Sequence, residues 1–254
     1  MINLEILYGV FFVILGICVG SFSNVLIYRL PKKESINFPA SHCTKCGHKL
    51  KWYHNIPLFS WIFLGGRCAF CKDKISIQYP IVEFLGGMLM FIAYYFEPNI
   101  LKALILGLCF IILLALSAID FKYKAVPDSL LYASLVLALC YSIIDFKFDG
   151  VIAASVLAFA FFALRFIVSF CLKKEAMGTA DIFIAGVIGA ILGLRLGFAS
   201  IFVAAILTLP AYAIVNKKGY ELPFVPFLAL GMLIVFCART ETIWILNYIG
   251  GANV

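Results

Sequence analysis

The chain has 254 residues, of which 64% are apolar and only 13% are charged, and its mean hydropathy is +1.07. A water-soluble domain of this length cannot carry such a composition without a large exposed apolar surface, so the soluble classes are excluded. The net charge of +7 is then interpreted as a determinant of membrane topology rather than of nucleic-acid binding. We therefore expect an all-α polytopic membrane protein whose partner is the lipid bilayer and not a nucleic acid.

The first apolar run predicts a permanent membrane anchor. It extends over residues 6–28, has no basic residue before it, and is followed by Arg29, Lys32 and Lys33. A cleavable secretory signal has the opposite arrangement, with its basic residues ahead of the apolar run. Residues 1–28 are therefore expected to form the first transmembrane helix.

A long polar segment, residues 29–79, comes next and contains nine of the twenty Lys and Arg residues. Beyond it the loops are short, and seven apolar runs make up a membrane domain over residues 80–254. These runs are 80–96, 103–119, 129–144, 151–172, 182–194, 196–215 and 222–238. Several are shorter than the roughly 20 residues that cross a bilayer, so they need flanking polar residues or a thinner membrane. The sequence predicts about eight transmembrane helices in total.

The distribution of basic residues predicts the topology. Fifteen of the twenty lie in residues 29–79 or in the three loops that share its side of the membrane in the eight-helix arrangement. The loop residues are Lys122, Lys124, Lys173, Lys174, Lys217 and Lys218. Because cytoplasmic loops carry an excess of Lys and Arg, the N-terminus is expected outside and residues 29–79 in the cytoplasm. Asp120 and Asp181, each at the end of an apolar run, then lie on the cytoplasmic side.

Four of the nine cysteines form two C-x-x-C pairs in the polar segment, Cys43 with Cys46 and Cys68 with Cys71. Two such pairs can place four thiolates around one ion, and the pattern is typical of structural Zn²⁺ sites. Two disulfides are the alternative, which an oxidising compartment would favour. The basic residues around the pairs indicate the cytoplasm, so we expect residues 29–79 to form a small zinc-binding domain.

Asp120 and Asp181 are the candidate catalytic residues. Ionisable groups at the margins of membrane helices are scarce and indicate a function by default. Two neighbouring carboxylates can share a proton and act as acid and base on a water molecule between them, as in aspartic peptidases. A helix dipole favours an anion at the N-terminus and disfavours one at the C-terminus. We therefore expect Asp181, at a helix start, to be ionised and Asp120, at a helix end, to hold the proton.

Structural and transport roles are the alternatives. Asp181 could serve only as the N-cap of its helix, although capping does not explain Asp120 at a helix C-terminus. Asp128 follows Pro127 and precedes an apolar run, so we interpret it first as a cap and second as a supporting residue of the site. In a transporter or channel the two aspartates would relay protons or bind cations. A noncatalytic zinc-bearing membrane adaptor is the other alternative.

Several motifs follow one another along nearly the whole chain. They are GSFSNVLIYRLP at 20–31, both C-x-x-C pairs, NIPLFSWIFLGGRC, ISIQYPIVEFLGG, the PD pair at 127–128, AMGTAD ending at Asp181, and LPFVPFLALG at 222–231. In kind and in order they resemble the motifs of the type IV prepilin peptidases, which are membrane aspartic peptidases of the G-x-G-D type.

The resemblance implies a multi-pass endopeptidase of the bacterial inner membrane. It would cut after the glycine of the short basic leader of a prepilin or pseudopilin, just before the apolar helix of that substrate. In many members it also implies N-methylation of the new N-terminal residue with S-adenosylmethionine, and a peptidase without methyl transfer is the narrower alternative. Carried over by position, the catalytic pair is Asp120 and Asp181, and the zinc ligands are the four paired cysteines.

The chain departs from the family pattern at three positions. Ala180 replaces the second glycine of G-x-G-D, His54 stands where an acidic residue is expected, and Val225 stands where a glycine is expected. Alanine favours an earlier and stiffer helix start than glycine, which affects loop flexibility and substrate fit. The acid at Asp181 is kept, so the expected activity is unchanged.

Four more residues are candidates for substrate binding or support. Gly178 is a candidate hinge or point of close approach, with a simple turn glycine as the alternative. Glu83, Glu175 and Glu221 lie on the predicted cytoplasmic face and could attract the basic leader of the substrate. A solvated interfacial charge is the simpler interpretation of each glutamate.

Overall fold

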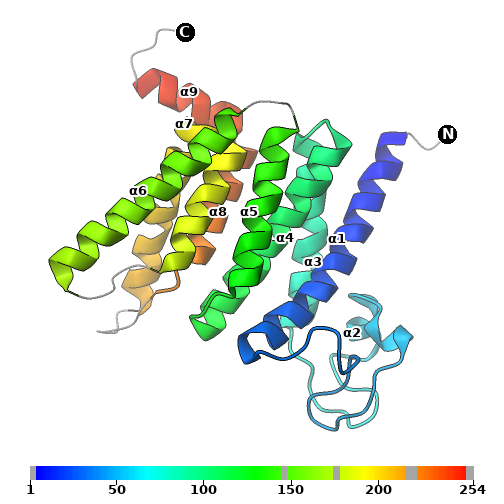
Figure 1. The fold of residues 1–254 in the computed structure, drawn as a ribbon. Helices are drawn as coiled ribbons and strands as arrows, with labels where there is room; N and C mark the ends of the chain where they lie inside the picture. Colours follow the sequence, from blue (N-terminus) through cyan, green and yellow to red (C-terminus); the bar gives the residue numbers. More distant parts are fainter. Residues whose placement is uncertain (1–3, 145–147, 174–177, 216–221, 250–254) are drawn as a thin grey trace. The chain divides into compact units, whose positions relative to one another are not determined.

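The computed structural model describes residues 4–144, 148–173, 178–215 and 222–249, and these residues form helices and loops without a β-strand. The all-helical fold is therefore confirmed for the described part of the chain. Contacts divide the chain into two compact units, Met1–Ala115 and Leu116–Val254. The α-helices are α1 (Leu4–Arg29), α2 (Phe59–Phe63), α3 (Gln78–Phe96), α4 (Ile100–Tyr123), α5 (Asp128–Ile143), α6 (Asp149–Leu172), α7 (Thr179–Val215), α8 (Val225–Cys237) and α9 (Arg239–Ile249) (Figure 1).

In the first unit, α1 and α3 pack closely because glycines line their contact. A Cβ atom built on Gly86 would lie 2.6 Å from the carbonyl oxygen of Gly16, and one built on Gly20 would lie 2.9 Å from the carbonyl oxygen of Val82. Small residues allow two membrane helices to bring their backbones together, which maximises van der Waals contact where lipid offers no hydrophobic driving force. The GSFSN and EFLGG motifs thus hold α1 against α3.

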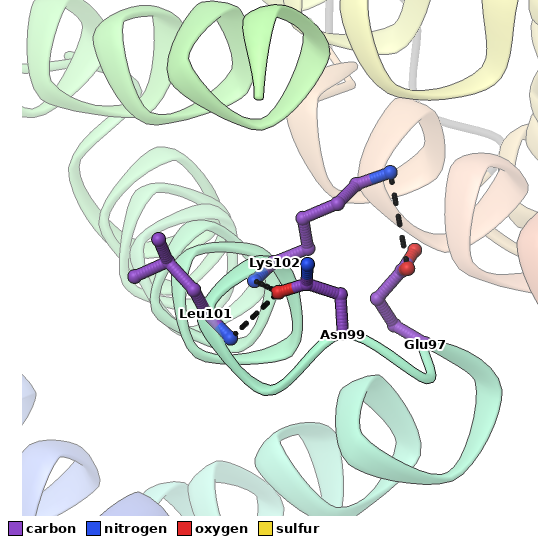
Figure 2. Close-up of polar contacts among 4 residues, drawn as sticks. All are labelled: Glu97, Asn99, Leu101 and Lys102. Carbon is purple, nitrogen blue, oxygen red and sulfur yellow. Dashed lines mark hydrogen bonds and ion pairs between the residues drawn. The ribbon is translucent and has the colours of Figure 1, made fainter. Parts of the chain in front are cut away.

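Polar side chains close the turn between α3 and α4 (Figure 2). The Asn99 side-chain oxygen accepts the backbone N–H groups of Leu101 at 3.0 Å and Lys102 at 3.2 Å, which caps the start of α4. The ammonium group of Lys102 also pairs with the carboxylate of Glu97 at 3.8 Å. These bonds fix a short hairpin of two long apolar helices at the end of α3.

In the second unit, α6 runs antiparallel to the first half of α7. A Cβ on Gly189 would lie 2.6 Å from the carbonyl oxygen of Ala153, and one on Gly186 would lie 3.7 Å from the Cβ of Ala158. Residues later in α6 therefore lie beside residues earlier in α7. Continued in this register, the last turns of α6 lie beside the first turn of α7, where Asp181 is found.

The long helix α7 reverses direction at Gly193, whose φ of 73° and ψ of −178° are not helical. A Cβ on Gly197 would lie 3.6 Å from the side chain of Ile188, whereas nine residues of continuous helix span about 13.5 Å. The two halves of α7 therefore fold back on each other (Figure 1). This break separates the two apolar runs that the sequence predicts at 182–194 and 196–215.

The predicted count of eight transmembrane helices is not confirmed. Judged by length and apolar composition, five helices in the described part of the chain can cross a membrane: α1, α3, α4, α6 and α7. The pair α8 and α9, bent by 89°, gives a sixth if it is one broken span. The count of six is two below the prediction because α5 has only 16 residues and because the two halves of α7 are counted as one helix.

Candidate active site and cysteine cluster

Asp120 lies in the last turn of α4 and is only 8% exposed. The backbone N–H of Val225, the first residue of α8, donates a hydrogen bond of 3.3 Å to its Oδ2 atom. The charge of Lys124 also acts favourably on this carboxylate. A residue at the C-terminus of one helix is thus bonded to the N-terminus of another, whose partial positive charge favours an anion.

Asp181 is the third residue of α7 and is 6% exposed. The helix begins at Thr179, three residues before the predicted start at Ile182, so Asp181 lies in its first turn but is not its N-cap. The backbone N–H of Gly178 donates to the Asp181 carboxylate. This bond is one half of a capping box, in which the acid at the third helical position reaches back to the N-cap residue.

The second unit brings the two aspartates close enough for their charges to interact. The charge of Asp120 acts unfavourably on a charge at Asp181, whereas the charge of Arg165 acts favourably on it. Both carboxylates are buried, and both accept a backbone N–H at the N-terminus of a helix. A buried carboxyl group that is held in place by a backbone N–H can take up or release a proton in a reaction.

Two participants in this arrangement were missed by sequence reasoning. Arg165 lies in the second half of α6, and the glycine register between α6 and α7 places it level with the start of α7. A charge within a long apolar run was the available signal. The other participant is the backbone N–H of Val225. The LPFVPF motif marked this segment as unusual, but no local sequence pattern could predict its hydrogen bond to Asp120.

The remaining predicted site residues lie in different surroundings. Glu83 belongs to the first unit, is 7% exposed, and accepts hydrogen bonds of 2.7 Å from the Ser21 hydroxyl and from the Leu58 N–H. Asp128 is the exposed first residue of α5, one position after the N-cap residue Pro127. Gly178 is exposed and precedes α7 directly. Glu175 and Glu221 fall outside the described residues.

The four paired cysteines converge, and their geometry fits a metal ion. The sulfur atoms of Cys43, Cys46, Cys68 and Cys71 all lie within 4.8 Å of one another, and those of Cys43 and Cys71 are 3.8 Å apart. A tetrahedral Zn²⁺ ion with bonds of about 2.3 Å separates its sulfur ligands by about 3.8 Å. The cysteines are free thiols, so the alternative of two disulfides is not found in this structure. This cluster can hold a metal ion.

The two C-x-x-C pairs are built in the same way. In each, the residue after the second cysteine has a positive φ, 68° for Gly47 and 59° for Lys72. Its N–H donates to the carbonyl oxygen of the first cysteine, at 2.9 Å in the first pair and 3.1 Å in the second. This tight turn directs both thiols of a pair to one side. Two matching turns thus supply two ligands each.

Backbone donors prepare one thiol of the cluster to ionise. The N–H groups of Cys71 and Phe70 lower the pKa of Cys68 to about 7. For Cys71, the Asp73 N–H lowers the pKa, but burial and the neighbouring thiols outweigh it and raise the pKa to about 12. The neighbouring thiols thus oppose a negative charge on Cys71, and a bound cation would offset that repulsion.

Two family models match the chain, and together they define a class of membrane peptidase. The Bacterial Peptidase A24 N-terminal domain matches residues 14–96, and the Type IV leader peptidase family matches residues 107–214. The first match contains the cysteine cluster, and the second contains both Asp120 and Asp181.

Curated relatives agree with the family models. A prepilin leader peptidase/N-methyltransferase of Myxococcus xanthus is 36% identical over 74% of this chain, and the match spans 57% of that relative. A type 4 prepilin-like proteins leader peptide-processing enzyme of Escherichia coli is 33% identical, covering 85% of this chain and 88% of the relative. A prepilin leader peptidase/N-methyltransferase of Vibrio cholerae is 33% identical over 76% of this chain and 80% of the relative.

The chain belongs to the type IV leader peptidase family, which confirms the resemblance drawn from its motifs. Its apolar helices and its relatives identify it as a bacterial membrane protein. No solved structure matches the chain.

Proposed function

We propose that the chain is an aspartic endopeptidase that removes the short basic leader from type IV prepilins or pseudopilins, cutting after a glycine, and that it also methylates the new N-terminus. Family membership supports both activities, since the relatives are named for leader processing and N-methylation. The observation that carries the peptidase assignment is the buried, interacting pair Asp120 and Asp181.

In the proposed mechanism, one carboxylate takes a proton from a water molecule as the water oxygen attacks the scissile carbonyl carbon. The protonated partner donates its proton to the carbonyl oxygen. As the C–N bond breaks, the first carboxyl group passes the proton taken from water to the leaving amine, and the hydroxyl of the intermediate returns its proton to the partner. Proton transfer of this kind requires the acid and base within hydrogen-bond reach of one solvent molecule. The N–H groups of Gly178 and Val225 hold the two carboxylates in place.

The methyl transfer would use S-adenosylmethionine, which supplies an electrophilic methyl group to the new amino terminus. This half of the proposal rests on family membership, because none of the described residues is assigned to the donor. A peptidase without methyl transfer remains the narrower alternative. The mass of the processed N-terminus decides between the two, since methylation adds about 14 Da to the mature substrate.

We propose that Cys43, Cys46, Cys68 and Cys71 bind one structural Zn²⁺ ion. Four thiolates saturate a tetrahedral zinc, so the ion would have no open position for catalysis and would stabilise the fold of residues 29–79. The spacing of the sulfurs and the paired turns support this assignment.

The proposed topology has an external N-terminus, a cytoplasmic zinc domain at 29–79 and a seven-helix peptidase domain at 80–254, preceded by the helix at 1–28. Eight crossings result if α5 crosses a thinned bilayer, if the two halves of α7 cross separately, and if the bent pair α8 and α9 is one broken span. Both aspartates then face the cytoplasm of the inner membrane. There they meet the leader of a prepilin whose apolar helix enters from the bilayer.

Cleavage of a purified prepilin precursor by the full-length enzyme in nanodiscs tests the peptidase. Asp120→Asn and Asp181→Asn should each lower kcat by at least about 10³-fold, because an amide can neither take nor give the proton. Asp149→Asn is the matched control, since Asp149 is an exposed carboxylate in the first turn of α6. Wild-type cleavage rates in both asparagine variants would refute the assignment, and ion flux without cleavage by the wild type would favour a transporter.

A further inference from the structure

The short helix α2 exposes large apolar side chains in a mainly polar part of the chain. Phe59, Ile62 and Phe63 are 60%, 65% and 84% exposed. Trp61, between them, faces the other way: its ring contacts Gly66, and its Nε1–H donates to the carbonyl oxygen of Ile75. One face of α2 is thus fixed to the two residues that flank the second C-x-x-C pair, Gly66 and Ile75, and the opposite face is an exposed apolar surface.

Hydrogen bonds fix the depth of α2 relative to the membrane helices of the same unit. The carboxylate of Glu83 accepts the N–H of Leu58, directly before α2, and the hydroxyl of Ser21 in α1, both at 2.7 Å. Glu83 lies five residues inside α3, and Ser21 lies eight residues before the end of α1. At 1.5 Å per residue, α2 begins about 7–12 Å inward from the ends of these helices.

The backbone at Leu58 is unusual in a way that supports this placement. Its φ of 62° with ψ of −54° is rare for a residue with a side chain. Such a conformation persists only when the surroundings hold it. The short bond from the Leu58 N–H to the buried Glu83 carboxylate is the contact that does so.

Exposed apolar side chains of α1 and α3 lie at the same level as α2. At the level of Ser21 and Glu83, the neighbouring side chains Phe22 and Phe84 are 50% and 60% exposed on helices long and apolar enough to span a membrane. The segment 29–79 around α2 also holds nine Lys and Arg residues, which complement anionic headgroups. Interfacial segments bury their apolar face about 5–10 Å into this boundary, which is comparable with the offset of about 7–12 Å between α2 and the ends of α1 and α3.

We propose that α2 is a membrane-inserted anchor: Phe59, Ile62 and Phe63 contact lipid acyl chains in the leaflet that surrounds the C-terminus of α1. Through Trp61, the anchor holds the cysteine cluster close to the membrane surface. This inference depends on membrane embedding alone and not on the proposed peptidase activity.

Labelling by a lipid that carries a photoactivatable diazirine on its acyl chain tests the anchor. The full chain is placed in nanodiscs of phosphatidylethanolamine and phosphatidylglycerol, illuminated, and mapped by peptide mass spectrometry. Residues 59–63 should be labelled within about threefold of the peptides that contain Phe22 and Phe84.

Phe38 is the internal control, because it is 79% exposed in the same polar segment but lies at a different depth. The guanidinium of Arg29, at the end of α1, donates to the carbonyl oxygens of Ser35, Ile36 and Pro39, which holds Phe38 near the helix end. Its labelling should be at least about tenfold weaker than that of Phe63. Equal labelling of the two regions, or none at 59–63, would overturn the proposal.

A triple variant, Phe59→Ser with Ile62→Ser and Phe63→Ser, provides the second measurement. These side chains are exposed, so the variant should keep its metal content and the labelling at Phe84 while losing labelling at 59–63. If 59–63 resists labelling in the wild type but crosslinks to a prepilin precursor, the surface binds protein and the anchor is refuted. None of these readouts requires cleavage, so a failed anchor and a failed peptidase are distinguishable.

Discussion

Asp120 and Asp181 each accept a backbone N–H at the N-terminus of a helix, which changes the expectation for their charges. The proton is expected on Asp120 because its own helix, α4, ends there. The N–H of Val225 adds a donor from α8 to that same carboxylate. Because both acids now face a helix N-terminus, the dipole of each acid's own helix no longer distinguishes them. That Asp120 holds the proton and Asp181 is ionised stays a prediction, which spectroscopy of the free enzyme can test.

Arg165 is the cationic neighbour of Asp181, as Lys124 is of Asp120. Arg165→Met should lower kcat about tenfold with little change in KM, because a partly buried charge pair contributes on the order of 1–2 kcal/mol. Arg165→Lys should recover most of the rate, since it keeps the charge. Steady-state cleavage of a prepilin precursor measures both.

Lys173→Met is the matched control for Arg165, because Lys173 is an exposed cation directly after α6. It should behave as the wild type. An Arg165→Lys variant as slow as Arg165→Met would show that packing of the guanidinium, rather than its charge, is what the enzyme needs.

At the scale of elements, most helices could be predicted from apolar runs, and the exceptions have physical causes. The reversal at Gly193 lies within two residues of the predicted boundary between two runs. Helix α2 was not predicted, because five residues are too few for a periodic pattern and because its position depends on Glu83, 25 residues from Leu58. The early start of α7 agrees with the strong helix preference of Ala180, which is buried and helical.

The glycines between α1 and α3 give a test of the packing in the first unit. Gly86→Ala should lower the free energy of unfolding by about 1–3 kcal/mol, because the new methyl group would lie 2.6 Å from the Gly16 carbonyl oxygen. Thermal unfolding in detergent measures the change. Gly9→Ala is the control on the same helix pair: its Cβ would meet the Tyr94 ring at an ordinary 3.5 Å. It should be neutral or slightly stabilising, so equal losses in the two variants would argue against this interface.

At the scale of the whole molecule, the candidate sites could be proposed from local sequence patterns, whereas their supporting contacts could not. Two C-x-x-C pairs are local signals, and the cluster that they form agrees with the expected ligand set. Asp120 and Asp181 stood out because charge is rare at the ends of apolar runs. Val225 and Arg165 lie on helices that reach the two aspartates only through tertiary packing. Periodicity and composition therefore cannot predict these supporting contacts.

Metal removal tests how the cysteine cluster contributes to the molecule. Purified protein should contain about one zinc per chain, and a chelator or Cys68→Ser should remove it. Trypsin should then cut within 29–79 at least about tenfold faster, because the two turns lose the ion that joins them. Cys18→Ser, at an exposed cysteine of α1, is the control. Unchanged zinc content in Cys68→Ser would contradict the proposed site.

The turn at Gly193 decides on which membrane face the last apolar helix begins. Asp120 ends α4, and α5 leads away from that face while α6 returns to it, so α7 starts there. Were α7 one straight rod of 37 residues, it would deliver the chain about 55 Å away. Val225 could then never donate to Asp120. The chain must therefore cross and return between Asp181 at the start of α7 and Val225 at the start of α8. The reversal at Gly193, which has a positive φ, makes this return possible.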